Sequence, residues 1–142
     1  MIIDANVLLY AADATAREHE TARTFLEEHL NGDTRVGLPW QSLGAFLRIS
    51  THPRIYDAPL AGTEAAAFVE DWLAAPAAWM PDVTASTWSI VRRLVDTYAV
   101  TGNLVPDAQL AALAIQHGVP VVSADSDFAR FTEVTWLNPF AR

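Results

Sequence analysis

Three aspartates stand where carboxylates commonly do chemistry in α/β proteins. Asp4 directly follows the apolar residues 1–3, and Asp125 lies two residues beyond a second apolar segment, 119–123. Asp107 follows Pro106 at the start of an apolar segment with helical spacing. In an open parallel sheet, the carboxyl ends of the strands and the adjoining helix starts face one crevice. We therefore expect these three side chains to converge, although the chain separates them widely.

Carboxylates that share a pocket need a cation, because each negative charge raises the pKa of its neighbours. The chain has no cysteine, and its four histidines show no ligand-like spacing, so the expected ligands are hard oxygens that suit Mg²⁺ or, as an alternative, Mn²⁺. A metal ion held there orients a water molecule, lowers its pKa and stabilises charge on a phosphodiester. We predict a metal-dependent hydrolase in which Asp4, Asp107 and Asp125 are both catalytic and metal-binding, with no organic cofactor.

Each of these acids also has a purely structural interpretation. Asp107 suits a helix cap, where an acid stabilises a helix by about 0.5–2 kcal/mol. Asp125 and Asp127 suit a tight turn or a cap, because Asp-Ser-Asp is a typical turn sequence. Asp4 is the hardest to explain in this way, since it stands at the mouth of a strand predicted to be central.

The elements that must position these acids alternate along the chain, which predicts an α/β domain with a mainly parallel sheet. No repeat or linker is visible, so one domain is expected over residues 1–142. Apolar patterning predicts strands at 1–3, 35–38, 79–80, 119–123 and 134–137. It predicts helices at 7–11, 15–30, 40–50, 63–75, 84–100 and 107–117, with Trp72 and Trp88 in the core.

The formal charge of −8, with no lysine, speaks against binding a nucleic acid. A bound divalent ion would invert the sign of the field locally, and the nine arginines would then have to supply the phosphate contacts. We interpret the pair Arg92 and Arg93 mainly as part of a solvated helix face, with RNA contact as the alternative.

The absence of cysteine excludes disulfides and cysteine-ligated zinc, and it permits a reducing cytoplasm. The first residues do not resemble a signal peptide, and no apolar run reaches the roughly 20 residues of a membrane span. A soluble, cytoplasmic protein without membrane association is the expectation.

Four segments taken together resemble the PIN-domain family, and in particular its VapC-like toxins. The opening residues 1–11 resemble the first PIN strand with its Asp-x-(Asn/Ser) motif, and 39–48 resemble the helix after the second strand. Residues 106–114 and 121–128 resemble the third and fourth motifs, in the order and with the spacing of that family. The resemblance implies a three-layer α/β/α sandwich around a mainly parallel sheet.

The resemblance also implies a Mg²⁺-dependent endoribonuclease that cleaves structured RNA such as tRNA or rRNA. Such toxins are usually homodimers that a cognate VapB-like antitoxin holds inactive. Carried over to this sequence, Asp4, Asp107 and Asp125 would bind the metal, Asp127 would be an auxiliary acid, and Asn6 would support Asp4 by hydrogen bonding. The apolar stripes around Phe25 and Phe46 are expected to contact the antitoxin or a second protomer.

One position departs from the family pattern. Many members carry a glutamate where this chain has Ala45, so one expected carboxylate is missing. Gln41, one helical turn earlier, would replace it only as a neutral ligand, and no spacing argument supports compensation by Asp82. The departure leaves open a binding module that keeps the PIN fold but not its activity.

A phosphotransfer domain built on an aspartate pocket is a further alternative. Receiver domains and haloacid-dehalogenase-like phosphatases normally need a lysine beside the phosphoryl group, and the chain has none. The phosphatase pattern also requires a second aspartate where Asn6 stands. Both observations disfavour this alternative.

Overall fold

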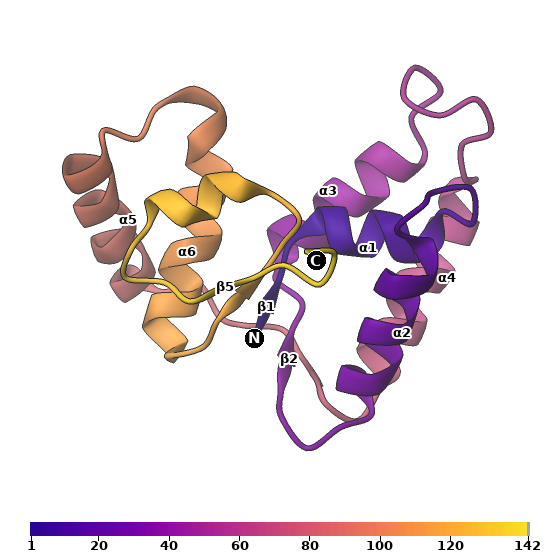
Figure 1. The fold of residues 1–142 in the computed structure, drawn as a ribbon, viewed down its shortest axis with the longest axis horizontal. Coiled ribbons are helices and arrows are strands. Elements are labelled where there is room, and N and C mark those ends of the chain that lie inside the picture. The colour runs from indigo at the N-terminus through magenta and orange to yellow at the C-terminus, as the bar shows by residue number, and fades with distance from the viewer. Residues whose placement is uncertain (142) are drawn as a thin grey trace.

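A five-stranded parallel sheet forms the centre of the fold, as a computed structural model that describes residues 1–141 shows (Figure 1). The strand order is β3-β2-β1-β4-β5, and every neighbouring pair is parallel. The strands are β1 (Ile2–Ile3), β2 (Val36–Gly37), β3 (Ala78–Trp79), β4 (Val121–Val122) and β5 (Trp136–Leu137). Parallel neighbours require crossover connections, and these contain the helices.

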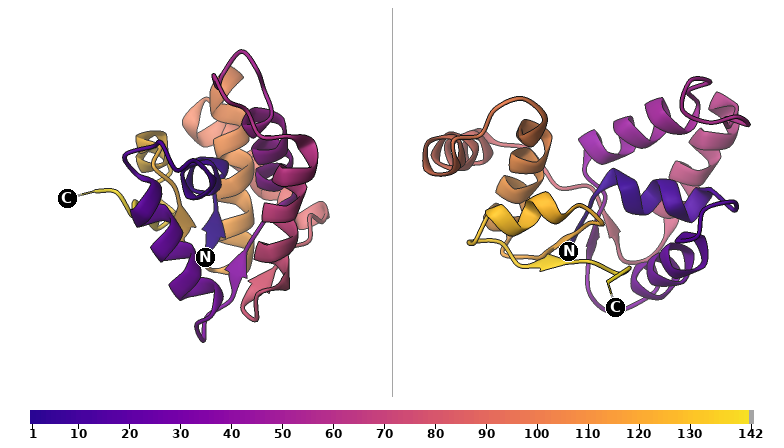
Figure 2. Two further views of the ribbon diagram at one scale, coloured as in Figure 1. Left: turned by 90° about the vertical axis from the view of Figure 1, so that its right-hand side faces the viewer. Right: turned by 45° about the horizontal axis from the view of Figure 1, so that its top comes forward.

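Helices cover both faces of the sheet, because successive residues of each central strand point to opposite sides. Ile3 and Val122 pack into a core with α1 (Ala5–Ala12), α2 (His19–Leu30), α3 (Trp40–Ser50) and α4 (Gly62–Ala74). Ile2 and Val121 pack into a second core with α5 (Ala85–Tyr98) and α6 (Val105–His117). Figure 2 shows these two groups of helices on either side of the sheet. The predicted three-layer architecture is confirmed.

The bounds of α6 follow from its sequence. Pro106 lies in the first turn, where its missing N–H costs no helical hydrogen bond. Gly118 ends the helix in the left-handed region, at φ 65°, which a glycine adopts without strain. The helix starts at Val105, two residues before the predicted start, because the 3₁₀ helix η1 (Gly102–Leu104) leads directly into it.

Two predictions about apolar side chains were wrong. Trp88 on α5 is 65% exposed rather than in the core, whereas Trp72 packs against the core as predicted. Phe46 is fully buried, and its ring lies 4.9 Å from that of Trp72. The apolar stripe around Phe46 is therefore used within the chain's own core and is not a free surface for a partner.

Another difference concerns the start of α2, which begins at His19 instead of residue 15. Thr15 donates from its backbone N–H and its hydroxyl to Oδ1 of Asp13, so this segment forms a turn.

None of the helices within residues 1–141 has the length and apolar character needed to span a bilayer.

Candidate metal centre

Asp4 lies where β1 ends and α1 begins. Its backbone N–H donates to the carbonyl of Val122 at 3.0 Å, which fixes it beside the end of β4. Its Oδ1 accepts from the N–H of Ala5 at 2.7 Å, so Asp4 is the N-cap of α1. A structural role that the sequence suggested for Asp107 thus belongs to Asp4.

Ser123 joins the two loops that leave β1 and β4. Its hydroxyl donates to Oδ2 of Asp4 at 2.7 Å and accepts from the N–H of Asp125 at 3.0 Å. Asn6 donates from Nδ2 to both Asp4 and Ser123, and its Oδ1 accepts from the N–H of Ala124. Because Ser123 is fully buried, solvent does not compete for the hydroxyl at the centre of this network, which joins the two strand ends.

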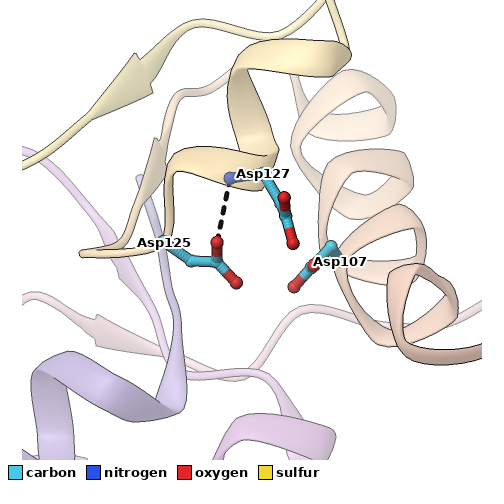
Figure 3. A group of neighbouring side chains, drawn as sticks. All are labelled: Asp107, Asp125 and Asp127. Carbon is cyan, nitrogen blue, oxygen red and sulfur yellow. Dashed lines mark hydrogen bonds between the residues drawn. The ribbon is translucent and has the colours of Figure 1, made fainter.

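Three carboxylates converge beside this network (Figure 3). Asp107, Asp125 and Asp127 each offer an oxygen atom, and these oxygens all lie within 4.8 Å of one another. Asp107 comes from the first turn of α6, whereas the other two flank the start of the 3₁₀ helix η2 (Ser126–Arg130). Oδ1 of Asp125 accepts from the N–H of Asp127 at 2.8 Å, so Asp125 caps η2 and also belongs to the cluster.

The electrostatics of the cluster favour a bound cation. Burial, followed by the charges of Asp125, Asp4 and Asp127, raises the pKa of Asp107 from its ordinary 3.8 to about 7. The pKa of Asp4 is also raised, chiefly by burial and to a smaller extent by the charge of Asp125, against the lowering effect of its hydrogen bonds. Both shifts mean that the metal-free site resists full ionisation.

The structure thus brings together a set of acids that differs in part from the predicted one. Asp107 and Asp125 converge as predicted, but the third member of the close group is Asp127, which the resemblance suggested only as an auxiliary acid. Asp4 lies near enough for its charge to act on Asp107, while its oxygens accept hydrogen bonds from Ala5, Asn6 and Ser123.

Ser123 was not among the predicted site residues. A signal was available, because a polar residue at the end of an otherwise apolar, buried strand needs a hydrogen-bond partner. Ser123 follows β4 at the level at which Asp4 follows β1, since Ile3 pairs with Val122. Asp82 is exposed and outside the close group, and Gln41 and Ala45 are half-buried on α3.

The donor set fits a hard divalent cation. The close group offers only carboxylate oxygens, which is the ligand type that Mg²⁺ and Mn²⁺ prefer. A cation would also relieve the mutual repulsion that raises the pKa of Asp107. The arrangement therefore combines ligands of the right chemistry with an electrostatic need for positive charge.

One family model and two relatives of known sequence match most of this chain. The family model described as the PIN domain matches residues 1–134. Ribonuclease VapC37 of Mycobacterium tuberculosis is 45% identical over 139 residues, which cover 97% of this chain and 96% of that protein. Ribonuclease VapC33 of the same organism is 36% identical, with 98% and 97% covered.

Solved structures show the same fold at low sequence identity. VapBC2 from Rickettsia felis, solved bound to a promoter DNA fragment, matches with a TM-score of 0.68 at 15% identity and covers 96% of both chains. FitAB bound to an IR36 DNA fragment matches with a TM-score of 0.63 at 19% identity and covers 99% of this chain and 96% of that one.

Proposed function

This chain belongs to the PIN-domain family, and on that premise we propose that it is a metal-dependent endoribonuclease and the toxin of a toxin–antitoxin pair. The observation that carries the proposal is the convergence of Asp107, Asp125 and Asp127 beside the Asp4–Ser123 network. The relatives named as VapC ribonucleases, which match nearly end to end, support the same activity.

Asp107, Asp125 and Asp127 would hold the ion, which we propose to be Mg²⁺, with Mn²⁺ as an alternative. When bound, such an ion supplies a water molecule of lowered pKa and stabilises negative charge on a phosphodiester. Asp4, the predicted third ligand, adds negative charge to the site, and we assign it to the catalytic set together with Asp107 and Asp125.

The chain's own residues perform two tasks in this proposal. Ser123 and Asn6 fix the carboxylate of Asp4 and the backbone of Asp125, so the strand ends do not separate when a charged substrate approaches. The carboxyl of Asp107, whose pKa is about 7, holds a proton in part of the metal-free molecules at neutral pH and releases it when a cation takes its place.

We also propose a cognate VapB-like antitoxin as a partner. The names of the similar structures VapBC2 and FitAB each denote two proteins. One chain in each structure matches the present chain over nearly its full length. We further propose that the substrate is an RNA such as tRNA or rRNA, that the chain forms a homodimer, and that it is located in the cytoplasm.

Cleavage of RNA by the purified chain tests the activity. We expect cleavage of total RNA with Mg²⁺ or Mn²⁺, and none after chelation with EDTA. Asp125→Asn should abolish cleavage, whereas Asp82→Asn, which removes the same charge from an exposed acid outside the close group, should leave it unchanged. Equal cleavage by wild type and Asp125→Asn would refute the proposed site.

The alternative function is a binding module without catalysis, which Ala45 favours because it removes an expected carboxylate. Metal titration combined with the cleavage assay on the same protein separates the two functions. Metal binding without cleavage of any RNA would support the binding module, and metal-dependent cleavage would exclude it.

A further inference from the structure

A chain with net charge −8 and no lysine must use particular arginines to hold an RNA backbone. Five of the eight arginines within residues 1–141 lie beside other groups, and neither Arg48 nor Arg54 forms an ion pair with a described residue. Carboxylates lie beside Arg17, Arg23, Arg92 and Arg93, and Arg35 lies over the ring of Trp79. The pair Arg92 and Arg93, for which the sequence offered RNA contact as an alternative, lies beside Asp96 and Glu133, neither of which belongs to the acidic cluster.

Arg130 differs from these arginines because its neighbour is the acidic cluster itself. It is the last residue of η2, three positions after Asp127, and its Nε lies 3.8 Å from Oδ1 of that residue. This separation exceeds hydrogen-bond length, and the guanidinium makes no hydrogen bond to any residue between 1 and 141. Since the side chain is 64% exposed, its five N–H donors remain available to a ligand.

We propose that Arg130 binds an RNA phosphate next to the metal centre and positions the strand for cleavage. The inference rests on the proposed ribonuclease function and adds the residue that recognises the backbone. One divalent ion would offset only two of the three negative charges that Asp107, Asp125 and Asp127 can carry, so a further cation at the rim of the cluster reduces the repulsion of an approaching phosphodiester.

The chemistry of the side chain suits this role. A guanidinium is planar, remains charged at any relevant pH and donates two parallel hydrogen bonds to a phosphate. Asp127 keeps the group beside the cluster through charge attraction, without occupying its donors. The contact between Arg130 and Asp127 lies within η2. The same short segment, with its N-cap Asp125, supplies two of the three clustered acids.

Substitution of Arg130, with Arg92 as the matched control, tests the proposal. Both side chains are about two-thirds exposed and lie near one carboxylate of their own helix, so Arg130→Ala and Arg92→Ala change charge and surface alike. We expect Arg130→Ala to raise KM for RNA by about tenfold to a hundredfold, with a much smaller change in kcat. Arg130→Lys should recover part of the loss, and Arg92→Ala should stay within about twofold of wild type.

Two further measurements distinguish phosphate binding from a structural role. The slope of log affinity against log salt, measured with single-stranded RNA in the Asp125→Asn background, should fall by about 0.7 in Arg130→Ala. The affinity for Mn²⁺ alone should stay the same or rise, because a cation beside Asp127 has been removed. A parallel loss of metal affinity and activity would overturn the proposal in favour of a structural role.

The outcomes separate this inference from the function on which it rests. If the wild-type chain cleaves RNA and Arg130→Ala behaves like Arg92→Ala, the role of Arg130 is refuted and the ribonuclease stands. If the wild-type chain neither cleaves nor binds RNA with any divalent metal, the proposed function fails and this inference fails with it.

Discussion

The carboxyl group of Asp107 couples the stability of this chain to pH and to metal. Its pKa of about 7 lies well above the ordinary 3.8, because the side chain is buried and faces other acids. A native state that raises a carboxyl pKa binds more protons than the unfolded chain between these two values. The metal-free protein should therefore lose stability as pH rises from about 4 to about 7.

Asp107→Asn should remove this cost. We expect the variant to be more stable than wild type at pH 8 without metal, by about 1–3 kcal/mol, and to lose that advantage near pH 4, where the native carboxyl is neutral. Urea unfolding in EDTA at both pH values measures the difference. An advantage of equal size at pH 4 and pH 8 would show that charge is not its cause.

Ser123 should matter for both stability and catalysis, because its buried hydroxyl is a donor and an acceptor in the network of Asp4 and Asn6. Ser123→Ala should lower the free energy of unfolding by about 1–3 kcal/mol, since it leaves buried polar groups unpaired. RNA cleavage should fall as well, because Asp4 loses one of the hydrogen bonds that orient its carboxylate.

Ser42 supplies the control for that substitution. Its hydroxyl is equally buried but forms no hydrogen bond within residues 1–141. Ser42→Ala should therefore be neutral or stabilising in the same urea experiment and should leave cleavage intact. Similar losses in the two variants would mean that the Ser123 network contributes nothing specific.

The strands of this sheet are two residues long, so each position in them carries much of the packing. Gly37 in β2 shows this most directly. A Cβ atom built on it would lie 2.7 Å from Cδ1 of Ile2 and 2.9 Å from the carbonyl oxygen of Met1. The close approach of β1 and β2, which sets the position of Asp4, therefore requires a residue without a side chain.

Gly37→Ala should destabilise the chain by about 1–3 kcal/mol through this overlap. Gly44→Ala is the matched control. A Cβ atom built on Gly44 would meet nothing within 4 Å, and the residue stands in the middle of α3, away from both helix ends. There the substitution should stabilise by about 0.5–1 kcal/mol. Thermal unfolding of both variants checks the prediction, which requires shifts of opposite sign.

α3 offers a test of the missing family carboxylate. The helix begins three residues after β2, the neighbour of β1, so its first turns lie toward the carboxyl edge of the sheet. Ala45→Glu should strengthen Mn²⁺ binding severalfold and raise activity at low metal concentration, because it restores a carboxylate at the position where the family pattern has one. Gly44→Glu adds the same charge at an exposed neighbouring position and should change neither.

The whole chain carries a charge of −8, part of which is concentrated in the cluster. A cation that binds only the native state stabilises it, by about 2.7 kcal/mol at a hundred times its Kd. Mg²⁺ should therefore raise the Tm in a saturable manner, whereas NaCl of equal ionic strength should act weakly. In Asp125→Asn the difference between the two salts should disappear, and its persistence would place the metal elsewhere.

Local patterns in the sequence predicted the ends of the strands to within one residue, and with them the acids that follow. The apolar patterns that predicted β1, β4 and α6 are local. The residues of a short segment indicate by their own apolar spacing that the segment is buried. Asp4, Asp107 and Asp125 were found for this reason, and so was the parallel α/β sandwich. The order of the four PIN-like segments predicted the family, which the match to the PIN-domain model confirms.

Which side chains meet followed from the packing of the whole chain. Asp127 meets Asp107, Phe46 is buried and Trp88 is exposed because elements far apart in the sequence pack together in one particular way. The same holds for charge, since Arg93 meets Glu133 from 40 residues away. Contacts of this kind depend on the distances and angles between elements, which no local pattern of residues encodes.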